Sequence, residues 1–402
     1  MSAPAPEDTG ETTTAILALV ASGTARTRVG IARSLGVAAS TVTLKVGQLL
    51  DAGLLEEGGW DAPSGGRRAR LLRVVPRSGR VLAASMGRHH ARVGSFDVQG
   101  GLVGALELPI EMGAPPERLL SRIVDGWEEL VGDLAAAGVR GIGLSLPGPV
   151  DPGAATAVQP STMPGWNGWR IATWFRQELG CTVLVDNDAN MSALGEHARR
   201  RTAGEAPLGT LLHVKAGTGL GGGLVLQGRL HRGATWLGGD IAHVRIPGGE
   251  RPCACGNRGC LETVVSGLAL VSAIAGTAPQ VTTPSALLDL AATGDPEAMT
   301  LLRTAGGTLG ETLATLVNFI NPDLVTIGGS LSRSPAFLAQ IQAKLYESCH
   351  PLATRDLRIE ASLAGADAEI TGIAQLVLRR AVAAPPHGAA HSSISRPRSA
   401  EA

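Results

Sequence analysis

The sequence carries no net charge, no long apolar run and few cysteines. Its 402 residues include 35 Lys and Arg and 35 Asp and Glu, so the formal net charge at pH 7 is zero. A neutral chain gives no overall signal for a nucleic-acid partner, and any such signal must be local. No stretch of about 18 residues is apolar and free of charge, which argues against a membrane span. The start "MSAPAPEDTGETTT" lacks the basic and apolar regions of a secretion signal. We therefore expect a cytoplasmic protein without a membrane partner.

Hydrophobic residues make up 44% of the chain and charged residues 17%. This balance is typical of a globular protein, and the length allows two or three domains with a substantial core. In the cytoplasm, cysteines usually stay reduced or bind metal.

Three of the five cysteines stand close together in the stretch "HVRIPGGERPCACGNRGCLE". Cys253 and Cys255 are too close in sequence for a comfortable disulfide. Together with Cys260 and His243 they form a Cys3His set, the ligand type of structural zinc. The alternative is a glycine-rich loop with incidental cysteines. We expect a structural Zn²⁺ ion, and we expect Cys181 and Cys349 to be core residues.

The first part of the chain has the pattern of a helix-turn-helix. Helical periodicity over 12–22 ends at a glycine, and further helices are expected near 28–35 and over 39–52. The second helix of such a motif lies in the major groove, with its N-terminal residues at the base edges. The residues predicted to contact bases are Ser40, Thr41, Thr43 and Lys45.

A predicted hairpin follows, with "PSGGRR" at its tip. Arg67 and Arg68 at this tip are expected to reach phosphates or the minor groove. Residues 24–80 contain ten basic and four acidic residues, a local charge of +6 in a neutral chain. A small protein-binding module with a solvated basic loop is the alternative. The basic hairpin favours DNA binding.

From about residue 81 the chain alternates short apolar strands, Gly-rich turns and helices. Two Gly-rich hairpin turns, at 85–88 and 217–223, predict two similar α/β lobes facing a cleft. The tail "AAPPHGAAHSSISRPRSAEA" is expected to be disordered.

Together these motifs resemble the ROK family of repressors and sugar kinases. The resemblance extends over residues 12–383 and rests on "GIGLSLPGPVD", "DNDAN", "GTGLGGGLV", "GATWLGGDIAHV", "CACGNRGCLE" and "PDLVTIGGS", in the family's order. It implies a two-lobed actin-like (ribonuclease-H-like) ATPase fold preceded by a winged helix-turn-helix. The expected division is a disordered start (1–11), a DNA-binding domain (12–78), a sugar-kinase-like domain (79–383) and a disordered tail (384–402).

The resemblance also implies site residues. Sugar hydroxyls would be bound by Asn187, Asp188, Asp240, His243 and Glu262, and Asp188 would be the general base of an active kinase. Nucleotide would lie against Gly217, Thr218 and Gly219 and against Gly328 and Gly329. A helix cap is the alternative reading of "DNDAN".

The sequence departs from the family's kinases at the first Gly-rich turn. Ser85 stands where the kinases carry an Asp that helps to position Mg²⁺ and phosphates, and a serine cannot supply that charge. Arg88 and His89 crowd the same turn, although an arginine could also bind phosphate. On the sugar side, Asp240 replaces the usual Glu and Ala242 replaces a Gly, so the ligand can differ from glucose.

Two functions compete on this evidence. The first is a sugar-responsive transcriptional regulator, a repressor of carbohydrate metabolism, with operator DNA and a small sugar as partners and a homodimeric or homotetrameric assembly. The second is an ATP- and Mg²⁺-dependent hexose kinase that has kept a DNA-binding arm. Ser85 favours the regulator.

Overall fold

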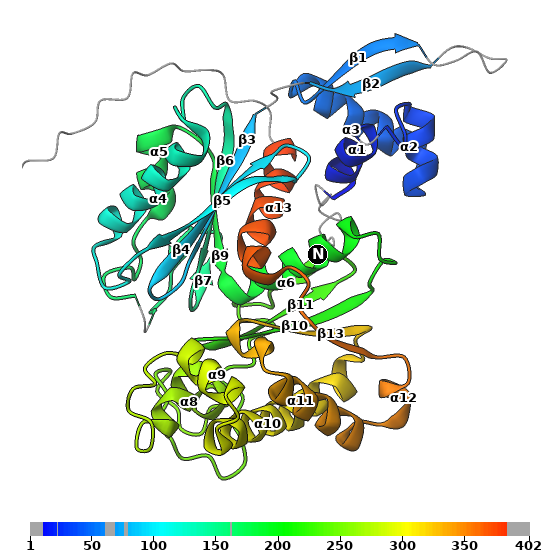
Figure 1. The fold of residues 1–402 in the computed structure, drawn as a ribbon. Helices are drawn as coiled ribbons and strands as arrows, with labels where there is room; N and C mark the ends of the chain where they lie inside the picture. The colour runs from blue at the N-terminus through cyan, green and yellow to red at the C-terminus, as the bar shows by residue number, and fades with distance from the viewer. Residues whose placement is uncertain (1–10, 22, 61–68, 76–78, 161–162, 384–402) are drawn as a thin grey trace, which may run out of the picture.

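A computed structural model describes residues 11–21, 23–60, 69–75, 79–160 and 163–383. They form a small N-terminal module and a larger body in which one sheet lies above another (Figure 1). The hairpin tip with Arg67 and Arg68, and both termini expected to be disordered, lie outside the described residues.

The N-terminal module has three helices and a two-stranded antiparallel sheet. Its elements are α1 (Glu11–Ala21), α2 (Arg28–Leu35), α3 (Ala39–Asp51), β1 (Leu55–Trp60) and β2 (Arg70–Val74). Thr27 caps α2 by accepting the Gly30 N–H, and Gly36 ends it with a left-handed φ of 65°. An angle of 120° between α2 and α3 is typical of a helix-turn-helix. The bounds expected from the sequence are correct to within one residue for α1, α2 and α3.

The module is packed around its own apolar core. The fully buried side chains of this core are Ile16, Leu17, Ile31, Val42, Val46, Leu49 and Leu72. Val98 of the body belongs to the same cluster, and the Arg140 side chain donates to the Ala52 carbonyl at 3.3 Å. The module therefore rests directly on the body.

The upper lobe of the body is built on a five-stranded sheet in the order β5-β4-β3-β6-β9. Its strands are β3 (Arg80–Met86), β4 (His90–Asp97), β5 (Leu102–Pro109), β6 (Val139–Leu146) and β9 (Val183–Asn187). One face is covered by α4 (Pro116–Val131) and α5 (Ile171–Leu179), and the small strands β7 (Val150–Asp151) and β8 (Thr156–Ala157) pair beside it.

The lower lobe repeats this sheet in the order β12-β11-β10-β13-β14. Its strands are β10 (Thr210–Ala216), β11 (Leu220–Leu226), β12 (Arg229–His231), β13 (Leu324–Gly328) and β14 (Arg358–Ala361). Its helices are α7 (Glu262–Val265), α8 (Gly267–Ile274), α9 (Pro284–Ala292), α10 (Pro296–Ile320), η1 (Ser330–Arg333), α11 (Pro335–Ser348), α12 (Pro351–Thr354) and η2 (Gly365–Asp367). In both lobes three antiparallel strands are followed by two parallel ones. The two Gly-rich hairpins predict two similar lobes, though not this strand order.

Two helices, α6 (Asp188–Thr202) and α13 (Ala368–Ala383), lie between the two sheets (Figure 1). They cross at very short distance through two glycines. A Cβ atom on Gly195 would collide with the Ala368 carbonyl, and one on Gly372 would collide with the Met191 carbonyl. This crossing holds α6 and α13 as one unit between the lobes.

Among the described helices, no single one is long and apolar enough to cross a membrane. Only when α2 and α3 are taken together, across the 120° bend between them, do their length and composition reach those of a membrane span.

Candidate functional site

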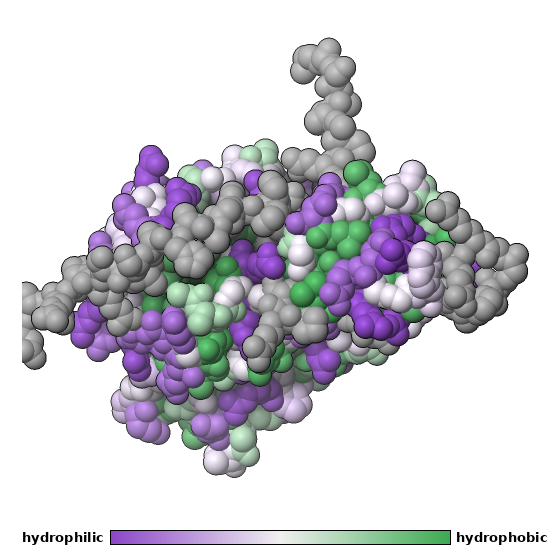
Figure 2. Space-filling view, turned by 90° about the horizontal axis from the view of Figure 1, so that it is seen from above, coloured by the Kyte–Doolittle hydropathy of each residue, from purple (hydrophilic) through white to green (hydrophobic). Residues whose placement is uncertain are grey.

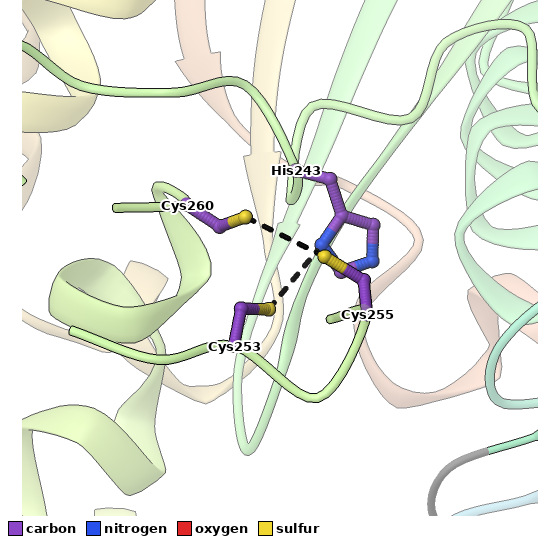
Figure 3. A group of neighbouring side chains, drawn as sticks. All are labelled: His243, Cys253, Cys255 and Cys260. Carbon is purple, nitrogen blue, oxygen red and sulfur yellow. Dashed lines mark hydrogen bonds between the residues drawn. The ribbon is translucent and has the colours of Figure 1, made fainter. Parts of the chain in front are cut away.

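The four residues predicted to bind zinc converge on one point (Figure 3). Their ligand atoms all lie within 4.8 Å of one another. The Nδ1 atom of His243 lies 3.6 Å from Cys253 Sγ, and Cys255 Sγ lies 3.6 Å from Cys260 Sγ. All five cysteines of the chain are free, so no disulfide competes for these sulfurs.

These separations fit a tetrahedral zinc ion. With zinc–sulfur bonds of about 2.3 Å and zinc–nitrogen bonds of about 2.0–2.1 Å, two sulfur ligands lie about 3.8 Å apart and a sulfur and a nitrogen about 3.6 Å apart. A zinc ion among these atoms would face Nδ1 of His243, the nitrogen that lies 3.6 Å from Cys253 Sγ. The Nε2 atom of His243 is then the nitrogen available to a second ligand.

The pKa values of the three thiols are shifted in different directions, and a hydrogen bond with the Asn257 backbone lowers that of Cys255. Burial, together with the two neighbouring thiols, raises the pKa of the Cys260 thiol to about 12. Burial also raises the pKa of Cys253. A divalent cation reverses this preference, because thiolates are the species that bind it.

Asn187 and Asp188 stand where β9 ends and α6 begins. The Asn187 side chain is the N-cap of α6: its Oδ1 accepts the N–H groups of Ala189 and Asn190. Its Nδ2 donates to the Gly148 carbonyl at 2.9 Å and to Asp188 Oδ1 at 3.1 Å. The cap interpretation of this motif is therefore correct, and the cap holds the Asp188 carboxylate in a defined orientation.

The remaining predicted sugar residues gather around Glu262. Burial raises the pKa of its carboxyl, and the nearby Asp240 and Asp188 carboxylates raise it further, while His243 opposes them. Asp240 accepts the Ala242 N–H at 2.9 Å, which orients its carboxylate. The structure thus brings together acidic groups and one imidazole that lie far apart in the sequence.

The two Gly-rich segments predicted to face nucleotide also lie side by side. A Cβ atom on Gly217 would lie 3.6 Å from the Ser330 nitrogen and 3.8 Å from Gly329 Cα. Gly329 adopts a φ of +80°, and its Cα lies so close to the Ala216 carbonyl that a side chain would collide there. The Gly217 carbonyl accepts the Gly267 N–H at 2.7 Å. Nucleotide binding by these loops stays a prediction.

Ser85 lies at the buried end of β3, and its hydroxyl donates a hydrogen bond to Glu369 of α13. The other oxygen of Glu369 lies 2.6 Å from Lys215 Nζ, and Lys215 also lies 2.6 Å from Asp188 Oδ2. Arg88 and His89 in the turn that follows β3 are exposed. The end of β3 therefore presents a hydroxyl that is already bonded to a carboxylate.

On the N-terminal module, three of the four residues predicted to contact bases reach the surface. Ser40 and Thr43 are exposed and Thr41 is half-buried. Lys45 differs from the expectation: only 5% of it is exposed, because it follows Val42 by one helical turn and shares the inward face of α3 with Val46 and Leu49. Burial also lowers the pKa of Lys45.

The view from above in Figure 2 looks onto the end of the molecule that carries this module, and it shows polar and apolar surface side by side. Exposed apolar residues of the module are Val29, Leu44 and Trp60. Arg70 lies over the Trp60 ring at 4.7 Å, and Glu57 pairs with Arg28 at 2.8 Å. A basic and aromatic face is thus held together at the β1–β2 hairpin.

A family model described as the ROK family matches residues 81–380. The chain belongs to the ROK family. The xylose repressor of Caldicellulosiruptor bescii is 26% identical over 368 residues, which cover 87% of this chain and 91% of that protein. The family predicted from the motifs is confirmed.

Solved ROK structures show the same fold. A ROK transcriptional regulator, a homologue of the E. coli MLC protein, matches with a TM-score of 0.73 and 24% identity over 93% of this chain and 96% of its own. A ROK glucokinase from Streptomyces griseus, solved with glucose and AMPPNP, matches with a TM-score of 0.64 and 25% identity over 74% of this chain and 99% of its own. The predicted two-lobed, actin-like fold is confirmed.

Two residues of this ROK body were missed by the sequence reasoning. Lys215 is the penultimate residue of the buried strand β10, two residues before Gly217, and a lysine at that position could have been recognised as a candidate site residue. Glu369 carried no signal, because it opens an ordinary amphipathic helix near the end of the body. Only the fold brings it to Ser85 and Lys215.

Proposed function

We propose that this ROK protein is a sugar-responsive, DNA-binding transcriptional regulator, and specifically a repressor of carbohydrate metabolism. The observation that carries the proposal is the union of a helix-turn-helix module, with its helices at 120°, and a ROK body whose first Gly-rich turn bears Ser85. The similarity to a xylose repressor over 87% of the chain supports it.

In this proposal α3 enters the major groove of operator DNA. Ser40, Thr41 and Thr43 meet base edges, because they lie at its N-terminal half and reach the surface. Arg67 and Arg68 contact phosphates or the minor groove. A homodimer or homotetramer presents two such modules to a repeated operator.

The effector is a small sugar bound between the lobes. Asp188, Asp240 and Glu262 accept from its hydroxyls, and His243 contributes Nε2 while Nδ1 faces Zn²⁺. The zinc ion, held by His243 and the three cysteines, is structural. It stabilises the loop whose residues line this side of the sugar site.

The kinase alternative is less well supported. The glycines predicted to face nucleotide, Gly217 and Gly329, lie close together, but Ser85 supplies no charge for Mg²⁺. Phosphoryl transfer depends mainly on positioning and on charge stabilisation. Asp188 is moreover paired with Lys215 at 2.6 Å. We therefore assign Asp188 to hydroxyl binding.

The decisive experiment selects operator DNA from a random duplex pool with the full-length protein. The selected duplex is then titrated by fluorescence anisotropy with and without D-xylose, D-glucose, N-acetylglucosamine and hexose 6-phosphates. We expect a specific complex whose affinity changes with at least one sugar. Selection of no sequence, or equal binding after deletion of residues 1–80, would show the proposal to be wrong.

A further inference from the structure

The ammonium group of Lys215 lies at the centre of the body, where carboxylates from the two central helices α6 and α13 meet. Lys215 is the penultimate residue of β10, in the lower sheet. Its Nζ lies 2.6 Å from Asp188 Oδ2 and 2.6 Å from Glu369 Oε1. All three side chains are largely buried, with 24%, 18% and 18% of their surfaces exposed.

The partners make Lys215 a permanent cation. Burial alone favours a neutral amine, but the charges of Asp188 and Glu369 and their hydrogen bonds raise the pKa of Lys215 well above its ordinary value. Without the ammonium, two carboxylates would face each other in a poorly solvated space. The ion triad is therefore held together by Lys215, in the way that a bound metal ion holds its acidic ligands.

The triad and Ser85 together join four elements of the fold. Lys215 comes from β10, Asp188 from the first turn of α6 and Glu369 from the first turn of α13. Ser85, at the end of β3 in the upper sheet, adds its hydroxyl to Glu369. The upper sheet, the lower sheet and both central helices thus meet through the side chains of Lys215 and Glu369.

From this point α13 runs to the DNA-binding module. Its later turns place Ile373, Ala374, Val377 and Leu378 against the upper sheet and α6. Figure 1 shows its far end beside the module, where it packs against α1 and α3. A shift at the first turn of α13 is transmitted along a rigid, well-packed helix.

We propose that Lys215 is the link by which an effector at Asp188 acts on the DNA-binding module through Glu369 and α13. A ligand hydroxyl that takes up Asp188 competes with Lys215 for that carboxylate. Lys215 then pairs with Glu369 alone, and the first turn of α13 changes its position or its stability. This inference rests on the proposed function, in that Asp188 is taken to face the effector.

The first test needs no effector. In the full-length, ligand-free protein, Lys215→Met leaves Asp188 and Glu369 without their shared cation. We expect the amides in the first two turns of α13 to exchange with deuterium at least about tenfold faster than in the wild type. Lys344→Met, which removes a lysine paired with Glu347 at 3.1 Å on the surface of the lower lobe, is the matched control and leaves α13 unchanged. Equal exchange in Lys215→Met and the wild type would overturn the link.

A second variant keeps the test valid if Lys215→Met does not fold. Glu369→Gln retains the shape of the side chain and removes only its charge, with Glu347→Gln as its control. We expect Glu369→Gln to bind D-xylose, D-glucose or N-acetylglucosamine, whichever the wild type binds, within about threefold of wild-type affinity, since Glu369 does not line the predicted sugar site. The effect of that sugar on operator affinity should be lost. A wild-type response in this variant would disprove the coupling.

The two levels of the proposal fail separately. If the wild type binds no operator or none of these sugars, the proposed function is wrong, while the exchange comparison still decides whether Lys215 controls α13. A double-mutant cycle on the deuterium exchange of the α13 amides tests whether Lys215 and Glu369 act through their direct contact. Lys215→Met and Glu369→Gln must be strongly non-additive, whereas additive effects would show that the two residues act independently.

Discussion

The hydroxyl of Ser85 donates to the carboxylate of Glu369, so the end of β3 and the start of α13 are joined by a hydrogen bond. The resemblance to the family's kinases implies an Asp at the position of Ser85, and here the carboxylate that meets Ser85 belongs to α13. An Mg²⁺–nucleotide complex would have to compete with Lys215 for the same carboxylates.

We therefore expect no sugar-dependent ADP release from the wild-type protein. A coupled assay with Mg²⁺–ATP and D-glucose, D-xylose or N-acetylglucosamine should stay at the sugar-free background. Turnover in the wild type that disappears in Asp188→Ala would contradict this prediction, because it would make Asp188 a working base.

The metal cluster leads to a prediction about composition and stability. Elemental analysis of protein purified without chelator should find one zinc ion per chain. Cys255→Ser should lower the melting temperature by roughly 5–10 °C, because metal-binding free energy is folding free energy and each kcal/mol is worth a few degrees in a body of this size. Cys181→Ser, at a half-buried cysteine outside the cluster, is the control. A zinc-free protein with unchanged melting would refute the assignment.

Much of this architecture was readable from the sequence because its signals are local. The bounds of α2 follow from a Thr cap and a Gly stop, and the metal ligands lie within one short stretch. The prediction that Lys45 contacts bases was wrong because it rested on the positive charge of the side chain and ignored its place in the helix. Val42, Val46 and Leu49 already put Lys45 on the inward face of α3. The Lys215–Glu369 pair could not be predicted, since β10 and α13 are brought together only by the complete fold.

The basic hairpin leads to a prediction about DNA affinity. Arg67→Ala should weaken binding to every duplex by a similar factor and lower the slope of log affinity against log salt by about one. Arg355→Ala, which removes an exposed arginine from the far lobe, is the control. Lys45→Met should leave the sequence preference unchanged, because Lys45 is buried. A loss of specificity in Lys45→Met would show that Lys45 turns outward on DNA.

A buried histidine predicts how stability depends on pH. His213 is fully buried between Ser192 and Thr326, at 2.8 Å from each hydroxyl. Burial lowers its pKa from the ordinary 6.5 to about 4; the charges of Lys215 and Arg200 act in the same direction, and that of Glu196 opposes them. The neutral imidazole is thus the form that fits the fold.

The direction in which stability changes with pH follows from proton uptake by His213. Between pH 6.5 and about 4 the unfolded chain protonates this histidine and the folded protein does not, so the free energy of unfolding falls as the pH is lowered through this window. The loss from His213 should reach about 3 kcal/mol at the lower end. Urea unfolding at several pH values should show a shallower dependence for His213→Gln than for the wild type and for the exposed control His231→Gln. Parallel curves for all three proteins would be incompatible with a neutral His213.

The last prediction concerns which sugar the site prefers. Asp240 is one methylene shorter than the glutamate usual at this position, and its carboxylate is oriented by the Ala242 N–H at 2.9 Å. Asp240→Glu should move the carboxylate toward the cleft and change the ratio of affinities for D-glucose and D-xylose by roughly 5- to 100-fold, since a mismatch of one methylene is worth about 1–3 kcal/mol. Isothermal titration with both sugars measures this ratio. Asp97→Glu is the matched control, because Asp97 accepts the Gln99 N–H in the same local geometry at a surface turn. If Asp240→Glu and Asp97→Glu leave the ratio equally unchanged, Asp240 does not touch the sugar, and the remaining predicted sugar residues are Asn187, Asp188, His243 and Glu262.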